Sequence, residues 1–70
     1  MSVHVLVNGE PRELPNGSTV ASVVQAIADA PNGRGVAVAL GGAVVPRARW
    51  QSTEVPDGAQ LELVVAVQGG

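Results

Sequence analysis

The residues of greatest chemical interest are the last two in the sequence, Gly69-Gly70. They follow a strand-like run over residues 61–68, so the sequence ends as a short segment without side chains that carries the α-carboxylate. Such a segment can extend through a channel too narrow for other residues. The carboxylate, ionised at neutral pH, is a competent oxygen nucleophile toward an activated phosphate. Two terminal glycines arise by chance in about 2% of chains this rich in glycine. The ending alone therefore only suggests a group-transfer role for Gly70, and the rest of the chain has to decide it.

The composition argues against several other kinds of site. The chain has no cysteine, which excludes disulfides, thiolate metal sites, iron–sulfur clusters and a cysteine nucleophile. The sequence has one histidine and no set of residues at the spacing of zinc ligands, which argues against a zinc site. No Ser/His/Asp set is apparent either, so the sequence predicts a protein without a catalytic site of its own. The formal charge is −2, with four arginines and no lysine, so the sequence does not predict the basic surface of a nucleic-acid-binding protein.

The length and hydropathy pattern predict one small soluble domain. Seventy residues are enough for a single core, and 46% of them are hydrophobic. The sequence does not begin with the positively charged residues and apolar block of a signal peptide. No apolar run approaches the ~18 residues of a membrane span. We therefore expect a cytoplasmic protein with no membrane partner.

The first third of the chain predicts a hairpin. Val3, Val5 and Val7 alternate with exposed positions, as in a half-buried strand. Asn8-Gly9 is typical of a type I′ turn, in which both central residues have positive φ. The second strand should run from Glu10 to Leu14 at a sheet edge, because Pro11 has no N–H to donate to a neighbour.

A helix is expected next. Ser18 or Thr19 can cap its start, and Pro31-Asn32-Gly33 should end it. An apolar stripe at spacings i, i+3, i+4 and i+7 is formed by Val20, Val23, Val24 and Ile27. Because β-branched residues lower helix propensity, this helix should depend on docking against a sheet.

The remaining residues predict three more strands. Residues 35–40 and 43–45 flank a Gly41-Gly42 turn, and the last strand spans 61–68. Between them, residues 47–55 have no clear period, and the single Trp50 is expected to cover one end of the core. We predict an α+β fold of the β-grasp type: a mixed five-stranded sheet with one main helix on one face and the first strand beside the last. Residues 1–68 would form this domain and 69–70 a flexible tail.

Two stretches are more specific than the fold pattern: Val44-Val45-Pro46-Arg47 with Trp50 shortly after, and the ending Val67-Gln68-Gly69-Gly70. The other matching stretches are Val7-Asn8-Gly9-Glu10, Gly17-Ser18-Thr19-Val20-Ala21, Val36-Ala37-Val38-Ala39-Leu40 and Asp57-Gly58. On these residues essentially the whole chain resembles the ThiS family, the ubiquitin-like sulfur carriers of thiamine biosynthesis. Two differences stand out. Gly41-Gly42 replaces the usual Asn-Gly, and Ala66 and Gln68 replace the arginines of ubiquitin, which argues against the eukaryotic ubiquitin machinery.

The resemblance implies a function at the end of the chain. A ThiF-like adenylyltransferase would use ATP and Mg²⁺ to adenylate the Gly70 carboxylate, and a persulfide donor would convert it to a thiocarboxylate. A ThiG-like thiazole synthase would then accept the sulfur. Val67, Gln68 and Gly69 would serve in tail recognition. The chain itself would bind no cofactor or metal and would be a monomer when free.

Strand alternation predicts a partner surface beside this tail. If the leucines of the last strand face the helix, the opposite face carries small apolar side chains. The predicted docking patch for both enzymes is Leu6, Ala37, Ala39, Val64 and Ala66. An exposed apolar patch commonly marks an interface, although scattered surface apolar residues are also normal.

Two other functions fit the same residues. One is a sulfur carrier of the same fold for molybdopterin synthesis, cysteine synthesis or tRNA thiolation. The other is a non-covalent β-grasp binding module, which would show no ATP-dependent mass change and would tolerate loss of Gly70.

Overall fold

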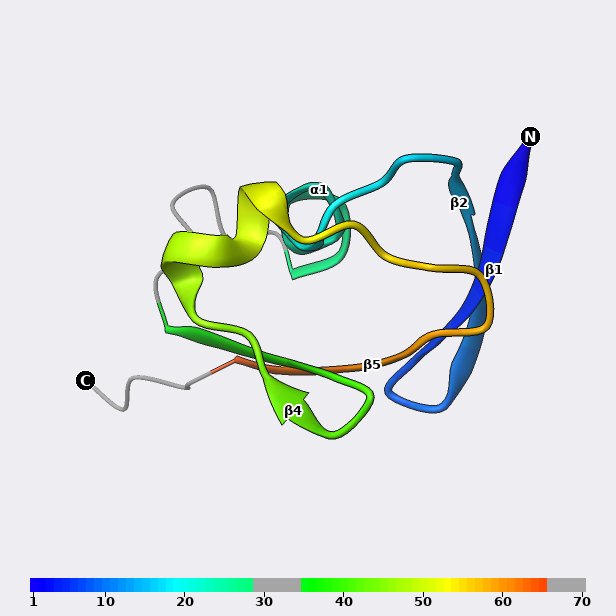
Figure 1. Ribbon diagram of the computed structural model, residues 1–70. Coiled ribbons are helices and arrows are strands. Elements are labelled where there is room, and N and C mark those ends of the chain that lie inside the picture. Colours follow the sequence, from blue (N-terminus) through cyan, green and yellow to red (C-terminus); the bar gives the residue numbers. More distant parts are fainter. Residues whose placement is uncertain (29–34, 66–70) are drawn as a thin grey trace.

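The computed structural model describes residues 1–28 and 35–65. Their helices and strands, in chain order, are β1 (Ser2–Val7), β2 (Glu10–Pro15), α1 (Val20–Val23), the π-helical segment η1 (Val24–Ala28), β3 (Val36–Leu40), β4 (Ala43–Val44), the 3-10 helix η2 (Arg47–Ser52) and β5 (Gln60–Val65). The five strands form one mixed sheet, and the helical segments lie together on one side of it (Figure 1). The predicted fold class is confirmed.

The last described strand lies at the centre of the sheet. The strand order is β2-β1-β5-β3-β4. β1 and β5 pair in parallel, with Leu6 opposite Gln60 and Val7 opposite Leu61, whereas β3 and β5 pair antiparallel along five residue pairs. The predicted placement of the first strand beside the last is therefore confirmed.

The first hairpin has the predicted turn. Asn8 and Gly9 have φ values of 52° and 82°, the left-handed conformation that Asn tolerates and Gly adopts without cost. β2 forms one edge of the sheet, which agrees with the position of Pro11, because an edge strand does not need every N–H for pairing.

The helix begins as predicted but changes its winding. Thr19 is the N-cap, and its side chain and that of Ser22 form a reciprocal capping box. From Val24 onward the backbone is π-helical instead of α-helical. β-branched side chains crowd the preceding turn of an α-helix, so we attribute the persistence of this short helix to docking on the sheet. The predicted end at residues 31–33 lies outside the described residues.

The 3-10 helix η2 was not predicted from the sequence. It spans only six residues, which is too short to produce a clear hydrophobic period. Its Trp50 is buried, and the indole Nε1–H donates a hydrogen bond to the Val45 carbonyl oxygen at 2.9 Å. The tryptophan thus belongs to the core, as expected, and joins η2 to the chain just after β4.

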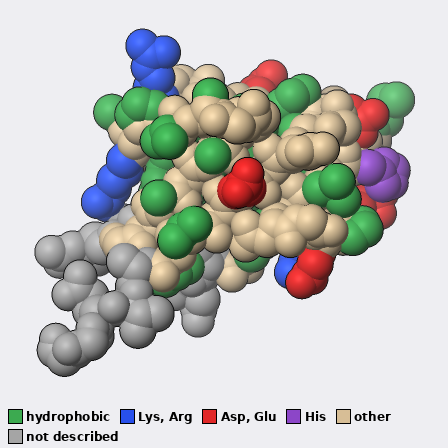
Figure 2. Space-filling model, turned by 90° about the horizontal axis from the view of Figure 1, so that it is seen from below, with side chains coloured by type: hydrophobic (Ala, Val, Ile, Leu, Met, Phe, Trp, Pro, Cys, Tyr) green, Lys and Arg blue, Asp and Glu red, His purple; other side chains and the backbone are tan. Residues whose placement is uncertain are grey.

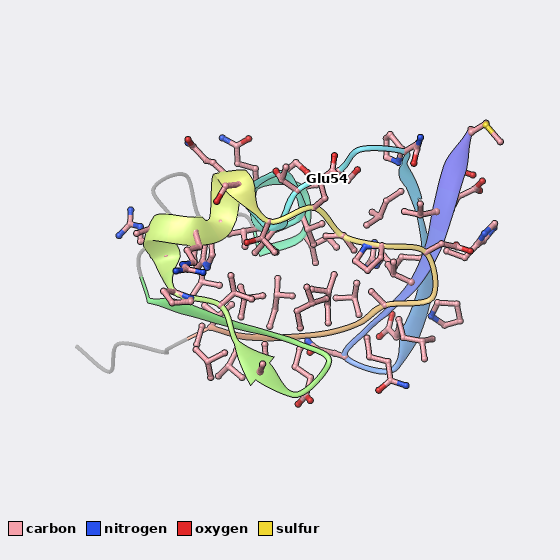
Figure 3. All side chains as sticks on the ribbon, viewed as in Figure 1. Glu54 is labelled. Carbon is pink, nitrogen blue, oxygen red and sulfur yellow. The ribbon has the colours of Figure 1, made fainter. Side chains whose placement is uncertain are left out.

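The core fills the space between the sheet and the helical layer (Figure 3). Its buried hydrophobic residues are Val3, Val5, Val7, Val20, Val23, Val24, Val38, Trp50, Val55, Leu61 and Leu63. Leu61 and Leu63 face the helices as alternation predicts, whereas Val65, the next inward position of β5, is about half exposed. The described core therefore ends before the last residue of β5.

We expect Leu61→Ala to destabilise the protein by about 2–5 kcal/mol, the cost of a cavity at a fully buried leucine. Leu61 is 1% exposed, whereas Val44 is 75% exposed, so Val44→Ala should stay within about 0.5 kcal/mol of wild type. Urea unfolding followed by the fluorescence of Trp50 measures both. Equal midpoints for the two variants would contradict this account of the core.

Candidate functional site

The predicted chemical site follows directly after β5. Residues 66–70, which include the predicted tail residues Val67, Gln68 and Gly69 and the predicted modification site Gly70, lie outside the described residues. What the structure describes is the strand that leads to them, which is hydrogen-bonded on both sides, to β1 and to β3. The tail is thus continuous with the central strand of the sheet.

Asn8 anchors this strand with its backbone and its side chain. Its N–H donates to the Leu61 carbonyl oxygen at 2.9 Å. Its Nδ2 donates to the Leu63 carbonyl oxygen at 3.1 Å, and its Oδ1 accepts from the Leu63 N–H at 2.9 Å. The side-chain amide therefore acts as an extra peptide group that continues the parallel pairing of β1 with β5. Sequence reasoning identified Asn8 only as a turn residue, because the turn signal says nothing about the strand on the other side.

A polar cluster lies on β1 away from the tail. The His4 carbonyl oxygen accepts from the Gly58 N–H at 2.7 Å, and the His4 N–H donates to Asp57 Oδ1 at 2.7 Å. The imidazole is exposed and lies 4.0 Å from the Glu13 and Asp57 carboxylates, and Glu13 also accepts from the Ser2 hydroxyl. Exposed pairs of this kind contribute little to stability. His4 therefore has a solvated, structural setting, as the sequence suggested.

The face of the sheet opposite the helices carries the predicted docking residues. Val64 lies across from Ala37, and Glu62 lies across from Ala39. Leu6 is 37% exposed and Val64 is 63% exposed. Ala39 is less exposed than these two and is half-buried. Four of the five predicted patch residues thus share one face, and the fifth, Ala66, lies outside the described residues.

Val44 extends this face and was missed in the sequence. It lies across from Ala39 in β4, and it is among the most exposed large hydrophobic residues. The Gly41-Gly42 turn could have revealed it, because a two-residue turn fixes the register of the two strands. We call the surface formed by these residues the outer sheet face: Leu6, Ala37, Ala39, Val44, Glu62 and Val64.

The outer sheet face is apolar with a carboxylate near its middle. Figure 2 views this side of the molecule and shows hydrophobic side chains around an acidic one. In the strand register, Glu62 is the outward-facing acidic residue of the central strand. This arrangement suits protein contact and offers no nucleophile–base pair for catalysis.

Other kinds of site find no support in the part of the chain that the structure describes. No three His, Asp or Glu side chains gather there as metal ligands. Neither is any helix within residues 1–28 and 35–65 long and apolar enough to cross a membrane.

Comparison with known proteins agrees with the fold and with the ending of the chain. The model of the ThiS family matches residues 5–70. A crystal structure of a thiamine biosynthesis protein (ThiS) from Geobacter metallireducens is 27% identical, with a TM-score of 0.77 over 97% of this chain and 100% of that chain. No curated protein matches the sequence significantly.

Replacing Asn8 by glycine should weaken the anchor of β5 while preserving the turn, because glycine accepts the positive φ. The loss of two side-chain hydrogen bonds should cost about 1–3 kcal/mol, and the Leu63 amide, which donates to Asn8, should exchange its hydrogen faster. Hydrogen exchange measured by NMR tests this, with Asn16→Gly as the matched control. Unchanged protection of Leu63 would contradict the anchoring role.

Proposed function

The chain belongs to the ThiS family of small sulfur carrier proteins, and from this we propose that it carries sulfur for thiamine biosynthesis as a thiocarboxylate on Gly70. The observation that carries the proposal is the family match, which runs through residue 70 and so includes the Gly69-Gly70 ending. The solved relative, described as a thiamine biosynthesis protein, supports the choice of pathway.

The proposed chemistry begins at the Gly70 carboxylate. One carboxylate oxygen attacks the α-phosphorus of ATP and pyrophosphate leaves, which gives an acyl-adenylate. A persulfide sulfur then attacks the acyl carbon and AMP leaves. The S–S bond of the product is cleaved by a thiol, which becomes part of a disulfide, and the thiocarboxylate remains. This group is anionic and nucleophilic, so it can transfer its sulfur to thiazole synthase.

The partners supply the catalysis in this scheme, and the chain supplies delivery and recognition. A ThiF-like adenylyltransferase would hold ATP and Mg²⁺, and a ThiG-like thiazole synthase would accept the sulfur. Val67, Gln68 and Gly69 are the residues that these enzymes would recognise before Gly70. We propose a cytoplasmic location, where ATP is available, and a monomer when free.

The outer sheet face is the proposed docking surface for both enzymes. Its exposed apolar residues share a face with the outward positions of β5, and β5 leads into the tail. A partner that grips the tail is therefore held close to Val64 and its neighbours. The predicted patch residues Leu6, Ala37, Ala39, Val64 and Ala66 belong to this proposal.

The intact mass of the protein tests the covalent chemistry. Incubation with the adenylyltransferase, ATP, Mg²⁺, a persulfide donor and a thiol should add about 16 Da, the replacement of one oxygen by sulfur on a group carrier. Fragmentation should locate the gain on Gly70, and a variant ending at Gln68 should gain nothing. No gain with an adenylyltransferase that is active on another carrier would favour a non-covalent module.

Val64→Asp tests the docking surface. Val64 is exposed, so the fold should survive, but a second carboxylate beside Glu62 should raise the KM of adenylation and the Kd for the synthase about tenfold or more. Ala48→Asp places the same change on an exposed residue of η2 and should alter neither constant. If the enzymes dock on another surface, both variants should keep the wild-type KM of adenylation and the wild-type Kd for the synthase.

A further inference from the structure

Glu62 is an isolated charge on the outer sheet face. It is the only charged residue of β3, β4 and β5. Ala39 lies across from it and Val44 lies beyond Ala39. Within the described residues its carboxylate has no hydrogen bond or ion pair. A partner that covered this face would remove water from Glu62, and a buried carboxylate without a counter-charge is costly. Such a partner must therefore provide a cation.

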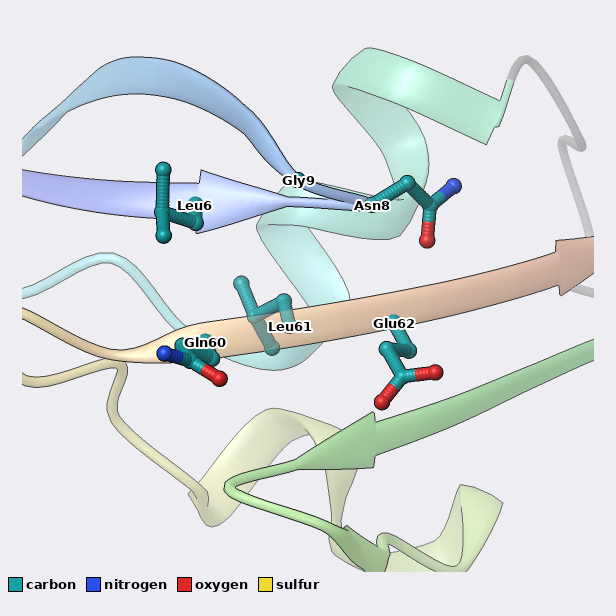
Figure 4. A pocket seen from close by; sticks show the side chains of 6 residues that line it. All are labelled: Leu6, Asn8, Gly9, Gln60, Leu61 and Glu62. Atoms are coloured by element: carbon teal, nitrogen blue, oxygen red, sulfur yellow. The ribbon is translucent and has the colours of Figure 1, made fainter.

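A groove beside Glu62 has room for that cation. It lies between β1 and β5, has a volume of about 450 Å³ and is lined by Leu6, Asn8, Gly9, Gln60, Leu61 and Glu62. Figure 4 shows Leu6 on β1 and, across from it on β5, Gln60 and Glu62 two positions apart. The Asn8 amide is engaged with Leu63. Of the residues that line the groove, this leaves Glu62 and Gln60 with polar side chains that can receive a ligand group.

The lining favours a long side chain with an apolar stem and a cationic end. The methylenes of such a side chain can pack on Leu6, and its charged end can reach Glu62. Arginine fits better than lysine, because its planar guanidinium donates two parallel hydrogen bonds to one carboxylate. Gln60, which also lines the groove, offers its side-chain oxygen as a further acceptor.

The charge distribution of the described residues also points to a basic partner. Arg47 and Arg49 belong to η2, which packs against α1 on the helix side of the sheet (Figure 1). Arg12 lies across from the buried Val5 and so does not share the outer face. The outer sheet face therefore carries Glu62 without a neighbouring cation in the part of the chain described, and it is complementary to an apolar surface with a central positive charge.

We propose that the groove between β1 and β5 receives an arginine side chain of the adenylyltransferase, and that Glu62 is the residue by which that enzyme selects this carrier. The inference rests on the proposed function. The adenylyltransferase is the partner because it must distinguish this chain while the tail still ends in an ordinary carboxylate, a group that every protein has. The synthase meets a thiocarboxylate, which gives it a second feature by which to recognise a carrier.

Glu62→Gln tests the contact by removing the charge and keeping the shape. The measurement is carrier-dependent pyrophosphate release from ATP by a ThiF-like adenylyltransferase from the same organism, with the persulfide donor present so that the enzyme turns over. We expect the KM for the carrier to rise about 30-fold with kcat unchanged, because the contact is the same in ground and transition states. Added salt should raise the wild-type KM and affect the variant much less.

Glu54→Gln is the matched control. Glu54 is exposed and lies on the helix side of the sheet (Figure 3), so the same loss of charge should leave KM unchanged. Glu62→Arg should raise the KM more than Glu62→Gln does, because the new positive charge repels the enzyme's arginine. Thermal unfolding of each variant confirms that the fold is intact.

The outcomes separate this contact from the proposed function. Normal adenylation of wild type with equal KM values for Glu62→Gln and Glu54→Gln would overturn the contact alone. A fall in kcat at constant KM, or an effect confined to synthase binding, would also overturn it. Failure of the adenylyltransferase to adenylate the wild type would overturn the proposed function and the contact together.

Discussion

The pairing of β5 between β1 and β3 is the constraint on which the rest of the structure depends. The direct parallel pairing with β1 is only two residue pairs long, and Asn8 lengthens it with a side-chain amide that occupies both backbone groups of Leu63. On its other side β5 pairs with β3 along its last five residues. A strand bonded on both sides resists being pulled out of the sheet. That property suits a segment whose continuation an enzyme would bind in the proposed function.

The same strand divides the molecule into two faces with different tasks. Leu61 and Leu63 point into the core, where they meet the valines of α1 and η1. Glu62 and Val64 point outward, where no helix or strand of the described chain covers them. Alternation along one strand thus supports the fold with one set of residues and exposes the proposed docking residues with the other. A substitution on one face need not disturb the other, so docking can vary without loss of stability.

A carrier of this kind has no need of a catalytic side chain. The reacting group is the proposed Gly70 carboxylate, and selectivity then depends on surfaces outside the tail. An apolar face attracts many partners, whereas a single carboxylate within it penalises every partner that lacks a cation in the right place. In our proposal Glu62 restricts which enzyme can dock, and the apolar residues around it supply the contact area.

The sequence by itself determined the local elements and the class of fold. Turn chemistry at Asn8-Gly9 and the alternation of valines in β1 are local signals, and both predicted the observed structure. It also pointed to the family, and four residues of the predicted patch share one face of the sheet in the structure. Only the tertiary structure decided which residues meet across strands: Asn8 with Leu63, Val44 with Ala39, and Leu6 with Gln60. The short η2 and the π-helical winding of η1 also appeared only there. Their physical cause is packing between segments distant in the chain, which leaves no period in the sequence of either segment alone.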